Sequence, residues 1–137
     1  MDDTGVRPVR HATVAQLQAA RAYAGTGLLS GTRTTARPGR TTTMEVSSVF
    51  ARAPEEVFRF CLHRTSFPAI MPDPIRPIWT STEHGELGGT YDFRWFYARV
   101  VPIRWTAFID SWQEGRRFSD LQLRGMFGYF HHTHTAD

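Results

Sequence analysis

The chain has 137 residues, 41% of them hydrophobic, and a formal net charge of +3, which allows one domain at most. The charge is uneven. Residues 1–43 hold six arginines and two aspartates, a local charge of +4, whereas residues 44–137 hold ten arginines and eleven carboxylates, a charge of −1. A nucleic-acid-binding domain carries its positive excess on the folded part. The distribution therefore argues against a nucleic-acid partner.

The single cysteine, Cys61, excludes an intramolecular disulfide and suits a reducing compartment. No apolar run approaches the roughly 18 residues that a membrane span requires. The N-terminus begins with Asp2 and Asp3 and lacks the apolar core of a secretory signal. We therefore expect a cytoplasmic protein without a membrane span.

The composition changes near Met44. Residues 25–43 are rich in Gly, Thr and Arg and show no period, so we expect them to be disordered. Thr13–Ala24 has helical spacing behind a threonine cap, with an apolar stripe too thin to predict tight docking. Residues 1–43 are thus interpreted as a disordered or weakly helical basic leader, and Met44 is an alternative start of the protein.

Residues 44–137 have the pattern of a globular domain, and its first elements are short. Val46, Ser48 and Phe50 alternate with their neighbours and predict a strand over Glu45–Arg52. A helix is expected from Pro54, because proline suits the first helical position and two glutamates follow it. A second helical piece is expected at Ser66–Ile70, ended by the prolines that follow.

The remaining segments predict an antiparallel meander, and hence an α+β fold. Strands are expected at Pro77–Glu83, at Thr90–Arg99, at Ile103–Trp112 and in a hairpin over Phe118–His134. Alternation places one set of mostly apolar side chains on a shared face of the middle strands: Tyr91, Phe93, Trp95, Tyr97, Ile103, Trp105, Ala107 and Ile109. Aromatic residues on both faces of these strands favour a curved sheet.

The hairpin over Phe118–His134 gathers most of the polar groups that can carry chemistry. If it closes around Met126 and Phe127, its opposing pairs are Asp120 with His134, Gln122 with His132, and Arg124 with Phe130. A carboxylate, an amide and two imidazoles on one surface form either a solvated face or the polar floor of a pocket.

Five motifs together resemble the START/Bet v 1-like (SRPBCC) superfamily and its polyketide cyclase/dehydrase-like branch. They are Ala53-Pro54-Glu55-Glu56-Val57-Phe58, Leu87-Gly88-Gly89-Thr90, Arg104-Trp105-Thr106, Phe118-x-Asp120-x-Gln122-x-Arg124-Gly125 and His132-x-His134. The likeness covers residues 44–135. It implies a helix-grip fold, in which a curved antiparallel sheet holds a long C-terminal helix and encloses a hydrophobic cavity. Family members bind lipids, sterols, polyketides, quinones or plant hormones, and some catalyse cyclisation or dehydration.

The chain departs from this family in two places. Met126 stands where family members usually have proline after the hairpin glycine. The chain also ends at Asp137, before the final strand and helix that the resemblance implies. We therefore expect an incomplete, apparently truncated domain over residues 44–137. Its open apolar face would need a cover, supplied by a partner, a second copy or the leader helix.

The leading functional prediction is the binding or carriage of a hydrophobic small molecule in a sheet-lined cavity, without a cofactor. The expected ligand-binding residues are Tyr91, Phe93, Trp95, Trp105, Asp120, Gln122, His132 and His134. One alternative is a cyclase/dehydratase-like enzyme with His132, His134 and Asp120 as its acid–base set. Another alternative is a protein-interaction module or a non-functional fragment.

Two imidazoles and a carboxylate also form a recognised metal-ligand set. A metal site needs further ligands and outer-shell partners, however, and His11, His63 and His84 have no spacing that supplies one. The sequence therefore predicts no metal site, and hydrogen bonds between the strands are the simpler expectation for these groups.

Overall fold

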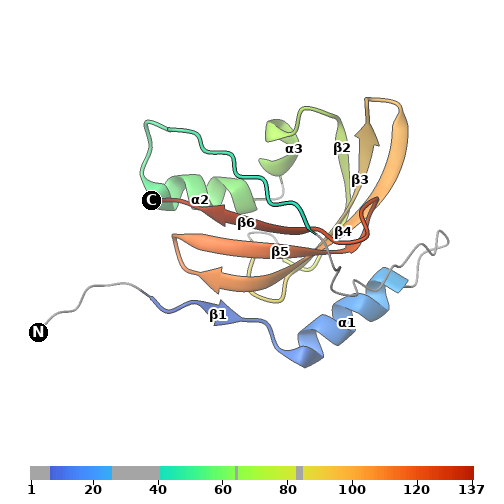
Figure 1. Cartoon of the computed structure of the whole chain (residues 1–137), viewed down its shortest axis with the longest axis horizontal. Coiled ribbons are helices and arrows are strands. Elements are labelled where there is room, and N and C mark those ends of the chain that lie inside the picture. Colours follow the sequence, from blue (N-terminus) through green and yellow to red (C-terminus); the bar gives the residue numbers. More distant parts are fainter. Residues whose placement is uncertain (1–6, 26–40, 64, 83–84) are drawn as a thin grey trace, which may run out of the picture.

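The computed structural model describes residues 7–25, 41–63, 65–82 and 85–137. Within these ranges the strands form one open, six-stranded antiparallel sheet, accompanied by three short helices (Figure 1). The α+β prediction is confirmed at this level. No helix in the described part of the chain is long and apolar enough to cross a membrane.

The sheet follows the order β2–β3–β4–β5–β6, and β1 pairs with β4. The strands are β1 (Arg10–His11), β2 (Ile75–Thr80), β3 (Thr90–Tyr97), β4 (Val101–Gln113), β5 (Arg117–Arg124) and β6 (His131–Thr135). The helices are α1 (Val14–Gly25), α2 (Pro54–Leu62) and α3 (Phe67–Ile70). From β2 onward each strand pairs with the next in sequence, so the expected meander is confirmed.

The central strand β4 has two partners along one of its edges. Its first part pairs with β3, from Val101 to Phe108. Beyond Ile109, β1 takes over this edge, with Arg10 opposite Trp112. The other edge of β4 pairs with β5. The N-terminal segment thus completes a sheet edge that β3 leaves free.

Helix α1 confirms the expected helix at Thr13–Ala24 but corrects the expectation of weak docking. Ala20 and Ala24 are buried against Phe108 and Leu123 of the sheet. Their small side chains let the helix backbone approach closely, which compensates for a narrow apolar stripe. Residues 7–25 therefore belong to the fold, while most of the segment expected to be disordered lies outside the described residues.

Helices α2 and α3 lie against the opposite face of the sheet. Proline begins α2 as expected, and Phe58 and Leu62 of this helix pack against Ile109, Trp112 and Phe118. Since side chains alternate between faces along β4, Ile109 lies opposite to Phe108, which contacts α1. The sheet thus separates an α1 face from an α2/α3 face.

The strand expected at Glu45–Arg52 is absent, and that prediction is wrong. Residues 41–50 have neither helix nor strand structure. The apolar side chains that alternation would have buried are exposed, Val46 by 80% and Phe50 by 60%, and Val49 of the other face is also exposed. An alternating pattern forms a strand only when a neighbouring backbone accepts its hydrogen bonds, and no described strand pairs with this segment.

Candidate functional site

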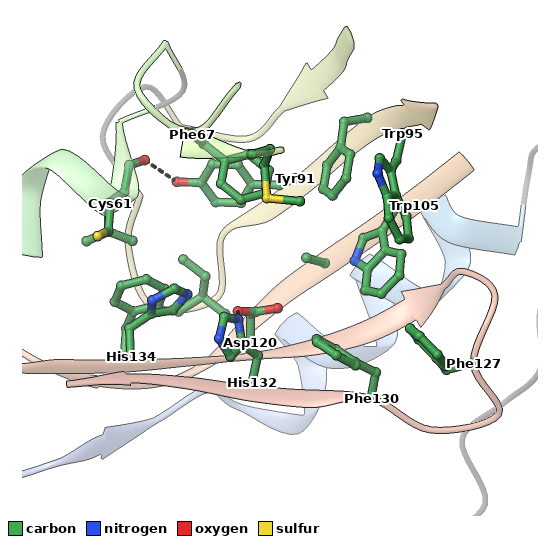
Figure 2. Close-up of a pocket in the computed structure, with 16 residues that line it drawn as sticks. Cys61, Phe67, Tyr91, Trp95, Trp105, Asp120, Phe127, Phe130, His132 and His134 are labelled. Carbon is green, nitrogen blue, oxygen red and sulfur yellow. Dashed lines mark hydrogen bonds and ion pairs between the residues drawn. The ribbon is translucent and has the colours of Figure 1, made fainter. Parts of the chain in front are cut away.

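A cavity of about 340 Å³ opens on the α2/α3 face of the sheet (Figure 2). Its walls come from β3, β4, β5 and β6, from α2, and from the segment around α3. Sixteen residues line it: Cys61, Leu62, Phe67, Met71, Tyr91, Phe93, Trp95, Trp105, Ala107, Ile109, Phe118, Asp120, Phe127, Phe130, His132 and His134. The lining is mostly apolar, and three of its polar side chains, from Asp120, His132 and His134, lie close together.

The alternation of β3 and β4 builds the floor of this cavity. Phe93 lies opposite Trp105 in the register, and Tyr91 lies opposite Ala107. The indole of Trp105 sits 5.2 Å from the ring of Phe130 and 6.2 Å from that of Phe93, measured between ring centroids. Large rings around one small alanine leave room above the centre of the sheet.

Tyr91 lies at the α2 end of the cavity. Its hydroxyl donates a hydrogen bond to the Leu62 carbonyl oxygen at 3.2 Å (Figure 2). Burial raises the pKa of Tyr91 to about 12, so the phenol stays neutral at physiological pH. Beside it, burial also raises the pKa of the Cys61 thiol. Cys61 itself is half-buried and lines the cavity.

The register of the β5–β6 hairpin differs from the prediction by two residues. Asp120 lies opposite His132, and Phe118 lies opposite His134. The connecting segment is longer than the tight turn expected, since β5 ends at residue 124 and β6 begins at residue 131. The side-chain amide of Gln122 donates to the Phe127 carbonyl oxygen at 2.7 Å, which holds this wider turn.

Gln122 was expected to bind the ligand and Arg124 to lie opposite Phe130, and neither expectation is met. Gln122 is buried, but its amide is engaged by the turn and it does not line the cavity. A β-bulge leaves one extra residue on β5, because Ala107 pairs with Gln122 and Thr106 pairs with Arg124. Arg124 is thereby turned toward the α1 face, where it interacts electrostatically with Arg104. It does not face Phe130.

Asp120, His132 and His134 converge at the polar end of the cavity (Figure 2). One potential ligand atom from each of the three lies within 4.8 Å of the others. His132 Nδ1 is 3.6 Å from Asp120 Oδ2, which is too long for a hydrogen bond. His134 stacks on Phe118 with ring centroids 4.4 Å apart.

Burial dominates the electrostatics of these three groups. It raises the pKa of Asp120 to about 7, and it lowers the pKa of His132 below its usual value and that of His134 to about 4. Both imidazoles are therefore neutral at physiological pH. The expected acid–base arrangement put Asp120 beside His134, and the register now places His132 directly opposite the carboxylate.

His131, the third histidine of this strand, points away from the cavity. Its Nε2 lies 3.1 Å from Asp110 Oδ1. The hydrogen bond that the His131 imidazole donates to this carboxylate raises the pKa of His131. Alternation along β6 thus divides the three closely spaced histidines, two to the cavity and one to the other face.

Seven of the eight ligand-binding residues predicted from the sequence line the cavity, and Gln122 does not. The sequence did not single out the other nine lining residues: Cys61, Leu62, Phe67, Met71, Ala107, Ile109, Phe118, Phe127 and Phe130. Phe118 and Phe130 each stand two residues before a predicted site residue and were detectable by the same alternation. Phe67 and Met71 come from the segment around α3, whose position over the sheet has no sequence signal.

Comparisons with protein-family models, with curated proteins and with solved structures find no match. The relationship to the SRPBCC superfamily therefore stays a prediction, and the function is argued from the cavity.

Proposed function

We propose that this protein binds a hydrophobic small molecule of lipid, polyketide or quinone type in the cavity of the α2/α3 face. The observation that carries the proposal is the cavity itself. Its volume of about 340 Å³ lies in the range of small-molecule sites, roughly 300–1,000 Å³. An open antiparallel sheet with helices over its cavity face is compatible with the sheet of a helix-grip domain of the SRPBCC type.

The polar groups of the cavity indicate what kind of ligand fits. Trp95 lines the cavity, and its Nε1 is buried without a hydrogen-bond partner among the described residues. Asp120, His132 and His134 supply a second polar point. A ligand with an apolar body and oxygen atoms satisfies both, since the rings bury the body while Trp95 donates to an oxygen.

The only cysteine gives a direct test that needs no mutation. Cys61 lines the cavity, so a bound ligand should cover its thiol. We expect saturating amounts of a long-chain fatty acid or a short-chain ubiquinone to slow alkylation of Cys61 by a maleimide severalfold. Native mass spectrometry of the same samples should show one ligand per chain. Unchanged alkylation together with the absence of a bound species would refute the proposal.

Two neighbouring aromatic residues provide a matched pair of variants. Phe130 lines the cavity, whereas Tyr129 is exposed and does not. Phe130→Ala should weaken binding of the fatty acid or quinone by about tenfold, because the apolar area it offers to the ligand is lost. Tyr129→Ala should leave binding unchanged. Equal effects of the two substitutions would place the ligand elsewhere on the surface.

A further inference from the structure

We propose that Asp120, His132 and His134 bind a divalent transition-metal ion at the polar end of the cavity, with its open coordination positions directed at the cavity interior. The site would add a metal-held anchor to the binding function proposed above. The metal proposal does not depend on that function, because metal binding can be measured without an organic ligand.

The geometry of the hairpin supports a shared ion. Asp120 and His132 are directly paired across β5 and β6, and His134 follows two residues later on the same face. Their ligand atoms already lie within 4.8 Å of one another. Ligands bound to one zinc ion at about 2.0–2.1 Å lie roughly 3.4 Å apart in a tetrahedral site, so small side-chain rotations close the site.

The surroundings of Asp120 also favour a metal ion. Asp120 is largely buried, with 15% of its side chain exposed. Its carboxylate accepts no hydrogen bond from the described residues, and His132 Nδ1 lies 3.6 Å from its Oδ2. An unpaired carboxylate in an apolar wall is costly, and a coordinated cation removes that cost.

The donor set also indicates which ion would bind. Two imidazole nitrogens and one carboxylate suit zinc, iron(II), cobalt(II) or nickel(II) better than magnesium or calcium, which prefer oxygen ligands. No further histidine has the spacing in the sequence to supply a fourth protein ligand. Three protein ligands are enough when solvent or a ligand completes the coordination, as in zinc and iron(II) sites that keep open positions.

The aromatic residues around the trio hold its imidazoles in place. His134 lies nearly parallel to Phe118, with an angle of 19° between the rings. The ring centroid of His132 is 4.0 Å from that of His134 and 5.8 Å from that of Phe130. Packed rings restrict rotation of the ligands, which favours a defined coordination geometry.

The test uses the full chain after treatment with a chelator. Titration with Co²⁺, followed by visible absorption, should show one ion per chain, and Zn²⁺ should displace it. Asp120→Asn and His134→Phe should each weaken Zn²⁺ binding at least tenfold. His134→Phe keeps a ring stacked on Phe118. His131→Gln, on the same strand but facing away, is the matched control and should bind Zn²⁺ as the unmodified chain does.

A second measurement keeps the test decisive if a variant fails to fold. On the unmodified chain, Zn²⁺ should shift the imidazole nitrogen NMR signals of His132 and His134. Absence of stoichiometric metal binding would overturn the proposal. NMR shifts confined to histidines other than His132 and His134 would also overturn it. So would a loss of Zn²⁺ binding in His131→Gln as large as the loss in His134→Phe. Fatty-acid binding that persists without any metal binding would refute this site alone and leave the proposed function standing.

Discussion

Each face of the sheet contains an aspartate with little solvent exposure, and the two carboxylates have different surroundings. On the α1 face, Asp92 accepts hydrogen bonds from Tyr23 at 2.7 Å, from Arg104 at 2.6 Å and from Thr106 at 3.2 Å. On the cavity face, the Asp120 carboxylate accepts none from the described residues, and His132 Nδ1 lies 3.6 Å from its Oδ2. A satisfied buried carboxylate stabilises a fold, whereas an unsatisfied one indicates a missing partner.

The α1 face contains a second unusual group. The guanidinium nitrogens of Arg124 are buried and have no hydrogen-bond partner among the described residues. Burial and the nearby charge of Arg104 lower the pKa of Arg124. Asp92 thus balances more than one positive charge, and the stability of this face depends strongly on it.

The largest effect is therefore expected from Asp92→Ala. The substitution removes the ion-pair partner of Arg104 and the negative charge near Arg124. Because both positive charges then lack compensation, we expect a loss of about 3–5 kcal/mol in the free energy of unfolding. Urea denaturation measures it. Asp110→Ala is the control, since its pair with His131 is only half-buried and should contribute less than about 1 kcal/mol. A loss below that level in Asp92→Ala would contradict the assigned role.

The faces should also respond differently to an enlarged alanine. Ala24 is fully buried between α1 and the sheet, so Ala24→Leu should destabilise the protein by about 1–3 kcal/mol through overpacking. Ala107 borders the cavity, so Ala107→Leu should cost less than about 1 kcal/mol and should weaken fatty-acid binding by filling space. Thermal unfolding compares the two. Equal losses would show that the cavity is not open space.

Replacement of the unsatisfied carboxylate should be tolerated. Asp120→Asn removes a buried charge that lacks donors, so the free energy of unfolding of the metal-free protein should stay constant or rise by about 1 kcal/mol. Urea denaturation at pH 8 with a chelator present is the measurement. A loss comparable to that of Asp92→Ala would mean that Asp120 has a structural partner.

The sequence predicted the faces of β3 and β4 correctly because their pairing is regular over eight consecutive residue pairs. In such a ladder the period of two places Phe93 and Trp105 on one side without further information. The same period predicted the wrong register and face near Arg124, because a bulge and a wide turn depend on packing between residues such as Gln122 and Phe127.

Pairing partners and helix docking were harder to predict. Glu45–Arg52 has a strand pattern, but a pattern does not supply a neighbouring strand. For α1, small residues such as Ala20 add little to an apolar stripe, so the sequence pattern did not predict tight docking. Their small side chains nevertheless let the helix backbone pack closely against Phe108. The sequence predicted that Asp120, His132 and His134 share one surface. Which histidine lies opposite Asp120 depends on the hairpin register, which the sequence did not determine.

Tyr91, on the cavity face, gives an effect that depends on pH. Its phenol has a pKa of about 12 in the folded chain, against about 10 in an unfolded one. The folded state therefore holds the proton more tightly, and stability that is complete below pH 10 is lost between pH 10 and pH 12, by roughly 2 kcal/mol. Urea denaturation at pH 9 and pH 11 captures about half of this fall.

Tyr91→Phe should flatten this alkaline fall and cost about 1 kcal/mol at neutral pH, because the hydrogen bond to Leu62 is lost. Tyr97 lies on the same strand and is 48% exposed, so Tyr97→Phe should keep the fall of the unmodified chain. If the fall persisted in Tyr91→Phe, another group would cause it. The phenol of Tyr91 in the unmodified chain would then be in contact with water, and the α2 end of the cavity would be open to solvent.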